Sequence, residues 1–283
     1  MSAVDIDHLK TWIGRQEILH DTVTPVPVKA LSATLDRDDH SPRDGDVLPK
    51  LWHWLYFLPI APAHQIGPDG HPKRGGFLPP VPLPRRMWAG GRYVFDRDLH
   101  VGEKISRTST ILDVSAKTGR SGTLVFVRVG HEVAGENGVA IHEEHDIVYR
   151  DPPAPGEAPP PPRPAPTDAV WSHTIIPDDV LLFRYSALTF NGHRIHYDRR
   201  YVTSVEGYPG LIVHGPLIAT YLMELYRNHD PRPLTGFSFR ASSPVFDIAP
   251  FSVHGTPTES GARLWAQGAD GSLRMEATCE VAA

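Results

Sequence analysis

The chain has 283 residues, of which 40% are hydrophobic and 22% are charged, and its formal net charge is −5 at pH 7. This composition is ordinary for a globular protein, and the length suits about two domains. The acidic balance and the lack of a long basic run argue against nucleic-acid binding, because phosphate contacts need clustered Lys and Arg. No stretch of about 18 apolar residues exists, so we expect no membrane span.

Cys279 is the only cysteine, so no internal disulfide can form. A reducing compartment is the simplest interpretation. The first residues, MSAVDIDHLKTWIGRQE, lack the basic and apolar regions of a signal peptide. We therefore expect a cytoplasmic protein.

In the first part of the chain, the pattern predicts one helix followed by four strands. The helix is expected at 26–36. Gly and polar turns separate the strands that follow, which favours an antiparallel arrangement. We expect these strands at 93–99, 104–114, 123–133 and 139–149.

A proline-rich segment then divides the chain. Nine of the fifteen residues of 152–166 are proline, which removes backbone N–H donors and favours polyproline II. We expect a first half at 1–151, this linker, and a second half at 167–283. A disordered spacer is the alternative interpretation of the linker.

The second part repeats the order of helix and strands. A helix from Pro216 to about Asn228 is apolar over most of its circumference, which is typical of a buried helix, and proline suits its first turn. The pattern predicts α+β architecture, with a helix and an antiparallel sheet in each half. The strands of the second half are expected at 235–246, 250–256, 263–268 and 273–281.

The segment YSALTFNGHRIHYD, residues 185–198, concentrates polar groups ahead of the second helix. His196 lies in this segment, and Val213-His214-Gly215 leads into the helix. A helix N-terminus offers unpaired N–H groups and a partial positive charge, which stabilise negative charge on a nearby oxygen. An imidazole beside it can transfer a proton. The pair favours proton chemistry next to a carbonyl group.

These residues resemble those of a known family. LTFNGHRIHYD is similar to the type-2 hydratase motif of MaoC-like proteins, and VHGPL is similar to the start of their central helix. The whole chain, including KRGGFLPPVPLPRRMWAGG, resembles the mesaconyl-CoA and itaconyl-CoA hydratase branch, close to mitochondrial 3-hydroxyacyl-thioester dehydratases type 2. The resemblance implies a double hotdog fold, in which each half wraps an antiparallel sheet round a central helix.

The resemblance also implies roles for individual residues. His196 corresponds to the catalytic histidine, and the Gly215 N–H would polarise the thioester carbonyl. Asn191 stands where the family usually has a catalytic Asp. Because an amide cannot exchange a proton as a carboxylate does, we expect Asn191 to hold the water through its amide oxygen and His196 to perform both proton steps. Asp198 is expected to support the loop.

Four further residues are expected to contact the substrate, namely Tyr185, Arg194, His214 and Arg86. Arg86 and Arg194 are the candidates for binding a substrate carboxylate, and Arg86 also for a CoA phosphate. The alternatives are a solvated loop arginine at position 86 and a structural role for His214. The spacing of His193 and His196 suggests metal ligands, but without a clear third ligand we expect neither a metal nor another cofactor.

We predict a hydro-lyase that adds water to the double bond of an enoyl-CoA, with mesaconyl-CoA to citramalyl-CoA as first choice. Itaconyl-CoA hydration and 3-hydroxyacyl-thioester dehydration are the enzymatic alternatives, and a non-catalytic acyl-CoA-binding protein is the alternative of another class. The expected partner is the acyl-CoA substrate, and assembly into a homo-oligomer stays open. Because only the second half carries the motif, we expect one active site, with the first half widening the pocket.

Overall fold

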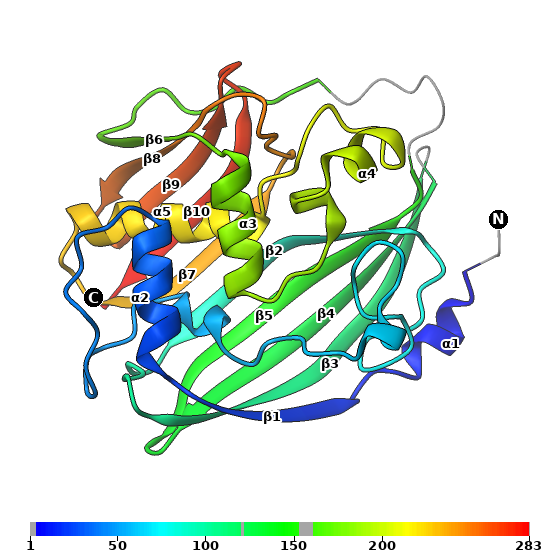
Figure 1. Ribbon diagram of the computed structural model, residues 1–283, viewed down its shortest axis with the longest axis horizontal. Coiled ribbons are helices and arrows are strands. Elements are labelled where there is room, and N and C mark those ends of the chain that lie inside the picture. Colours follow the sequence, from blue (N-terminus) through cyan, green and yellow to red (C-terminus); the bar gives the residue numbers. More distant parts are fainter. Residues whose placement is uncertain (1–3, 120–121, 153–160, 283) are drawn as a thin grey trace.

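The structure is a computed structural model that describes residues 4–119, 122–152 and 161–282. This part of the chain contains a ten-stranded antiparallel sheet with the order β1-β3-β4-β5-β2-β7-β10-β9-β8-β6 (Figure 1). The first-half strands are β1 (Gln16–Thr22), β2 (Arg85–Phe95), β3 (Lys104–Gly119), β4 (Gly122–Gly135) and β5 (Gly138–Arg150). The second-half strands are β6 (Trp171–Ile175), β7 (Leu234–Ala241), β8 (Phe251–Thr258), β9 (Gly261–Gly268) and β10 (Leu273–Val281).

The two halves of the sheet repeat one topology. The central pair β2–β7 joins them, with Tyr93 opposite Phe237. Outward from β2 the order is β5, β4, β3, β1, and outward from β7 it is β10, β9, β8, β6. The expected repeat of elements and the α+β class are therefore confirmed.

The helices gather on one side of this sheet (Figure 1). The longest, α5, begins where the sequence predicted, and every residue from Leu217 to Tyr226 is buried. It packs against β8, β9 and β10. The α-helices are α1 (Ile6–Lys10), α2 (Pro25–Thr34), α3 (Asp179–Leu188), α4 (Arg199–Ser204) and α5 (Gly215–His229). The 3-10 helices are η1 (Trp52–Leu55), η2 (Ala63–Gln65) and η3 (Arg194–His196).

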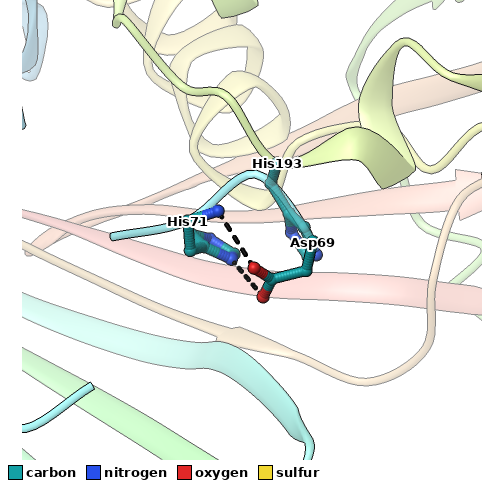
Figure 2. Close-up of side chains that lie close together, drawn as sticks. All are labelled: Asp69, His71 and His193. Carbon is teal, nitrogen blue, oxygen red and sulfur yellow. Dashed lines mark hydrogen bonds and ion pairs between the residues drawn. The ribbon is translucent and has the colours of Figure 1, made fainter. Parts of the chain in front are cut away.

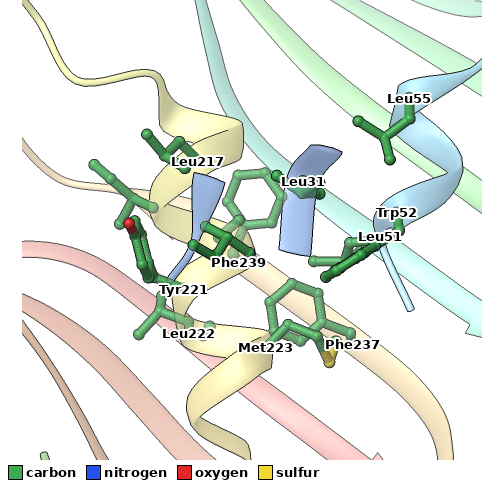
Figure 3. Packing of buried hydrophobic residues seen from close by; sticks show 14 of the residues in the cluster. Leu31, Leu51, Trp52, Leu55, Leu217, Tyr221, Leu222, Met223, Phe237 and Phe239 are labelled. Atoms are coloured by element: carbon green, nitrogen blue, oxygen red, sulfur yellow. The ribbon is translucent and has the colours of Figure 1, made fainter. Parts of the chain in front are cut away.

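The two halves share one hydrophobic core (Figure 3). Leu31 of α2 and Trp52 of η1 pack with Tyr221 of α5 and Phe237 of β7 in this cluster. Each large apolar side chain buried in this way contributes about 1.5–3 kcal/mol. The Trp52 Nε1–H also donates to Glu224 of α5 at 2.8 Å, so a polar contact links the halves as well.

Several strands differ from the sequence prediction, since β3 continues to Gly119 and β7 ends at Ala241 instead of at residue 246. β2 begins at Arg85, because pairing with β5 continues past a bulge between Trp88 and Gly90. A Cβ at Gly90 would lie 2.7 Å from the carbonyl oxygen of Phe239, so glycine permits the close approach of β2 and β7. Because glycine is uncommon inside strands, the sequence pattern did not predict this part of β2. Strands β1 and β6 were not predicted, because they are short, mostly exposed edge strands without clean alternation.

The remaining segments bear on the other expectations. The predicted first-half helix is α2, which packs mainly against α3 and η1. Within the linker, 153–160 lie outside the described residues, while Ala165 N–H donates to the carbonyl of Gly271 at 3.0 Å. The division into 1–151 and 167–283 stays a prediction. Within the described ranges, we find no helix long and apolar enough to cross a membrane.

Candidate active site

His196 has the geometry of a proton acceptor. It lies in η3, is only 7% exposed, and donates its Nδ1–H to the carbonyl oxygen of Ile212 at 2.7 Å. Because a carbonyl oxygen can only accept, the hydrogen is on Nδ1 and the lone pair is on Nε2. Burial lowers the pKa of His196 to about 4, so the imidazole is neutral at pH 7.

His214 and Tyr185 hold the His196 ring in place. The rings of His196 and His214 stack with their centroids 3.7 Å apart, and Tyr185 meets His214 edge-on at 5.0 Å. His214 Nε2 is hydrogen-bonded to the hydroxyl of Ser186, which follows Tyr185 in α3. Since His214 is the N-cap of α5, the stack fixes His196 relative to the start of that helix.

Gly215 is the first residue of α5, so its backbone N–H lies at the start of the helix. The N–H groups of a first helical turn have no partner within the helix, and the helix dipole adds positive charge there. Among the described residues outside its own helical turn, no atom lies within 4 Å of the position of a Gly215 Cβ. A carbonyl oxygen placed at this N–H would be polarised.

Asn191 follows α3 in a tight turn. Its backbone N–H donates to the carbonyl of Ser186 at 2.8 Å, and its side-chain Oδ1 accepts the His193 N–H at 3.0 Å. One lone pair of the amide oxygen is therefore used inside the loop. The amide NH₂ remains as a donor toward a ligand.

Asp198 and Arg194 bind each other at the end of the loop. Asp198 caps α4 by accepting the Tyr201 N–H at 2.9 Å, and its other oxygen accepts Arg194 Nε–H and Nη2–H at 3.0 and 2.8 Å. Arg194 also donates from Nη1 to the carbonyl of Pro68 at 3.0 Å and lies over the Tyr201 ring. Its guanidinium is thus engaged within the protein, which does not favour the predicted contact with substrate.

A loop of the first half docks on this segment (Figure 2). Arg194 N–H donates to the carbonyl of Asp69 at 2.9 Å. Next to it, Gly70 has a φ of +90°, and a Cβ there would lie 1.8 Å from the carbonyl oxygen of Gly192. The contact between the two loops therefore requires glycine at position 70. The first half thus supplies the outer wall of the His196 loop.

Asp69, His71 and His193 form a compact cluster in this contact (Figure 2). Asp69 accepts His71 Nδ1–H at 3.1 Å, and the rings of His71 and His193 lie 4.0 Å apart. One potential ligand atom from each residue lies within 4.8 Å of the others, so the spacing would permit a metal ion.

The electrostatics of this cluster disfavour a divalent cation. Burial lowers the pKa of His71, Asp69 opposes this shift, and the positive charges of Arg86 and Arg74 add to it. The same two arginines would repel an added dication. Asp69 already accepts both the ring and the backbone N–H of His71. The cluster is therefore better suited to holding the two loops together.

Arg86 stands at this end of the site. It lies in β2 opposite Tyr149 of β5, which excludes the alternative of a loop arginine. Burial lowers the pKa of His193 to about 2, and the charge of Arg86 contributes to that shift, so the two side chains are near each other. Arg86 is accordingly the better placed of the two predicted substrate arginines.

A cavity of about 150 Å³ lies beside the start of α5. Pro216, Tyr185 and Thr189 line it from the second half, and the other lining residues come from the first half. These first-half residues are His53, Trp54, Tyr56, Phe57, Leu58, Pro59, Trp88, Arg107, Glu143 and His145. The cavity therefore lies between the halves, next to Gly215.

The first-half wall of this cavity carries a buried carboxylate. Glu143 accepts His53 Nε2–H and Trp54 Nε1–H, each at 3.0 Å, and His145 Nε2–H as well. Burial acts to raise the pKa of Glu143, but His145 and His53 hold it well below its usual range. Glu143 is thus an ionised group whose oxygens are occupied by the wall itself.

Comparison with known proteins assigns the family. The family model of hydroxyacyl-thioester dehydratase type 2 matches residues 51–247. The chain is 50% identical over 270 residues to the mesaconyl-C(4)-CoA hydratase of Chloroflexus aurantiacus, covering 95% of this chain and 96% of that protein. The chain belongs to the hydroxyacyl-thioester dehydratase type 2 family. It is therefore an enzyme of the hydratase and dehydratase class, as the sequence predicted.

Solved structures place this family member in a known fold. A MaoC-like dehydratase superposes with a TM-score of 0.72 at 14% identity, covering 96% of this chain and 99% of the other. A Mycobacterium tuberculosis protein described as having a double hotdog fold superposes with a TM-score of 0.59 at 11% identity, covering 95% and 96%. The predicted double hotdog fold is confirmed.

Several residues at the site of this dehydratase-family chain were not predicted. Asp69 and His71 lie more than 110 residues before the motif, and Arg107 and Glu143 come from first-half strands. In the sequence, these four residues look like ordinary turn or strand positions, so nothing nearby indicates that they lie at the site. The exception is Glu143, whose sequence signal was the cluster of three histidines and three glutamates in GHEV and IHEEHD, since strand positions ordinarily alternate with apolar side chains.

Proposed function

We propose that the chain hydrates a short dicarboxylic enoyl-CoA, with mesaconyl-CoA thioesterified at C4 as the substrate and citramalyl-CoA as the product. Two observations carry this proposal: the small cavity beside Pro216 at the start of α5, and the ring stack on His214 that holds His196 at the same helix start. The 50% identical relative bears the name of that activity.

In this mechanism the thioester carbonyl oxygen lies at the Gly215 N–H. His196 Nε2 accepts a proton from water while the water oxygen bonds to the β-carbon, and the π electrons move to the carbonyl oxygen as an enolate. The α5 N-terminus stabilises that negative charge. The Asn191 amide orients the water, and protonated His196 then delivers the proton to the α-carbon, which restores the neutral base.

The surrounding residues support these steps. His214 and Tyr185 keep the ring of His196 and the acyl group in place, and Asp198 holds the loop. Arg86 faces the phosphates or the carboxylate of the substrate, whereas Arg194 is occupied by Asp198 and Pro68. No step requires a cofactor. We also expect the enzyme to act in the cytoplasm, and a homo-oligomeric assembly is compatible with this scheme.

Dehydration of a 3-hydroxyacyl thioester is the second candidate, because the family carries that name. The cavity argues against long chains. A cavity of 150 Å³ in another protein holds one benzene-sized molecule, which suits a short branched acyl group. Itaconyl-CoA is of similar size and stays an alternative substrate.

A substrate panel tests the proposal. Mesaconyl-C4-CoA, itaconyl-CoA, crotonyl-CoA and a long-chain enoyl-CoA are compared by kcat/KM, and we expect mesaconyl-C4-CoA to be hydrated fastest. Fastest turnover of the long-chain compound would favour the fatty-acyl alternative. Thermal stabilisation by all four without turnover would favour a non-catalytic binding protein.

A further inference from the structure

Arg107, on β3, is a cavity-lining arginine with an unused donor. Its Nε is buried and has no hydrogen-bond partner among the residues that the structure describes. The guanidinium lies over the ring of Phe57, 5.2 Å from its centroid, which fixes its plane. Because an unpaired buried N–H costs free energy, this donor is suited to a ligand.

Glu143 does not use this donor. Its two oxygens already accept the ring N–H groups of His53, Trp54 and His145, and within the described ranges no ion pair joins it to Arg107. Burial lowers the pKa of Arg107, and the charges of Glu143 and Glu17 act in the opposite direction, so Glu143 compensates part of the Arg107 charge without a direct ion pair. The hydrogen-bond donor at Nε of Arg107 stays unused.

The position of Arg107 suits the end of an acyl group. Pro216 lines the same cavity and directly follows Gly215, the proposed contact of the thioester carbonyl. A cavity of this size accommodates about six non-hydrogen atoms. An acyl group that enters past Pro216 therefore brings a carboxylate on its β-carbon within reach of the wall that carries Arg107.

We propose that Arg107 binds the free carboxylate of the substrate and so selects dicarboxylic enoyl-CoA over enoyl-CoA with a hydrocarbon acyl group. This inference rests on the proposed function and assigns the carboxylate to a residue outside the catalytic motif. A guanidinium pairs with a carboxylate through two parallel N–H bonds, which gives both affinity and orientation. Arg86 is then free to serve the CoA phosphates.

The test compares two substrates that differ only at the carboxylate. Mesaconyl-C4-CoA and 3-methylcrotonyl-CoA share the branched skeleton, with a methyl group in place of the carboxylate in the second. The ratio of their kcat/KM values is measured for wild type, Arg107→Gln and Arg107→Lys. If the analogue turns over too slowly, its inhibition constant and that of mesaconyl-C4-CoA give the ratio. Both compounds are assayed on one preparation, so partial misfolding cancels.

We expect wild type to prefer mesaconyl-C4-CoA and Arg107→Gln to reduce that preference roughly 10- to 100-fold, since a hydrogen bond to a charged group contributes about that factor. Arg107→Lys should retain an intermediate preference. Arg128→Gln is the matched control, because Arg128 is an exposed arginine on β4, paired with Asp146 at 3.1 Å, and should leave the ratio unchanged.

Two results would overturn the assignment. One is an unchanged ratio in Arg107→Gln, and the other is collapse of the ratio in Arg86→Gln with Arg107→Gln unaffected. Failure of the proposed function is visible separately, since wild type would then not hydrate mesaconyl-C4-CoA at all.

Discussion

Both halves bury a group of imidazoles, but they give those rings different partners. In the second half, His196 donates to a neutral carbonyl and stacks on His214, so its Nε2 keeps a lone pair. In the first half, His53 and His145 donate to the ionised Glu143. The ring of His196 can therefore accept and release a proton, whereas the rings of His53 and His145 are hydrogen-bonded to a charged carboxylate. The buried histidines of the two halves therefore differ in their hydrogen-bond partners, which are a neutral carbonyl for the proposed base His196 and an ionised carboxylate for His53 and His145.

Replacing His196, the proposed base, should produce the largest effect on kcat. We expect His196→Ala to fold normally and to lose roughly 100- to 10,000-fold in kcat, the usual contribution of a positioned acid–base group. Steady-state kinetics with mesaconyl-C4-CoA and far-UV circular dichroism check the two parts of this statement. Near-normal turnover by the folded variant would remove His196 from the mechanism.

Replacing the carboxylate of the other half should instead affect stability. Glu143→Ala leaves buried N–H donors unpaired and should lower the free energy of unfolding by about 3–5 kcal/mol at pH 7. Because folding lowers the pKa of Glu143, its contribution is present above the ordinary glutamate range and is lost as the pH falls. Urea denaturation should therefore show a smaller difference between wild type and variant in acid.

Glu144→Ala is the control for this prediction. Glu144 neighbours Glu143 on β5, but its side chain is 39% exposed and pairs with Arg92 at 2.7 Å, so its loss should cost about 0–1 kcal/mol. Equal losses in both variants would mean that the buried network has no special importance.

The contact between the loops of the two halves can be tested at Gly70. Gly70→Ala places a Cβ against Gly192 and should displace the His196 loop, reducing kcat by roughly 10- to 100-fold, as small misplacements of catalytic groups do. Gly14→Ala introduces the same left-handed strain at φ +85° but meets no described atom within 4 Å. If both variants kept wild-type kcat, the docking of the first half would not matter for catalysis.

The smallest effect is expected at Asn191. Asn191→Ala removes the partner of the water, and with it one neutral hydrogen bond, so kcat should fall up to about tenfold while the KM stays similar. A KM increase with unchanged kcat would indicate that Asn191 binds substrate instead of orienting water.

The loop that carries His196 and the helix α5 were predictable because their sequence signals are local. Residues 185–198 lie in one continuous segment, and α5 is apolar over most of its circumference. The resemblance to a hydratase motif then identified His196 and Gly215. The roles of these residues stay predictions until they are tested by substitution.

The first-half contributions were not predictable, since they depend on tertiary contacts. Gly70 meets Gly192 only after both halves have folded, and Arg107 faces the cavity only because β3 lies in the shared sheet. The ion-pair partner of Arg194 could not be predicted from the sequence either. Its pairing with Asp198 one helical turn onward competes with a substrate carboxylate, and the sequence alone does not decide between them.

The pH dependence of kcat/KM for wild type and Asn191→Asp tests the central claim that a neutral His196 is the sole acid–base group. Because burial lowers the pKa of His196 to about 4, wild-type kcat/KM should be flat across the neutral range and fall in acid through one ionisation. In Asn191→Asp the added negative charge should raise the pKa of His196 and move that fall to higher pH. A second ionisation in the wild-type profile, or an acid limb that does not move in Asn191→Asp, would contradict the account.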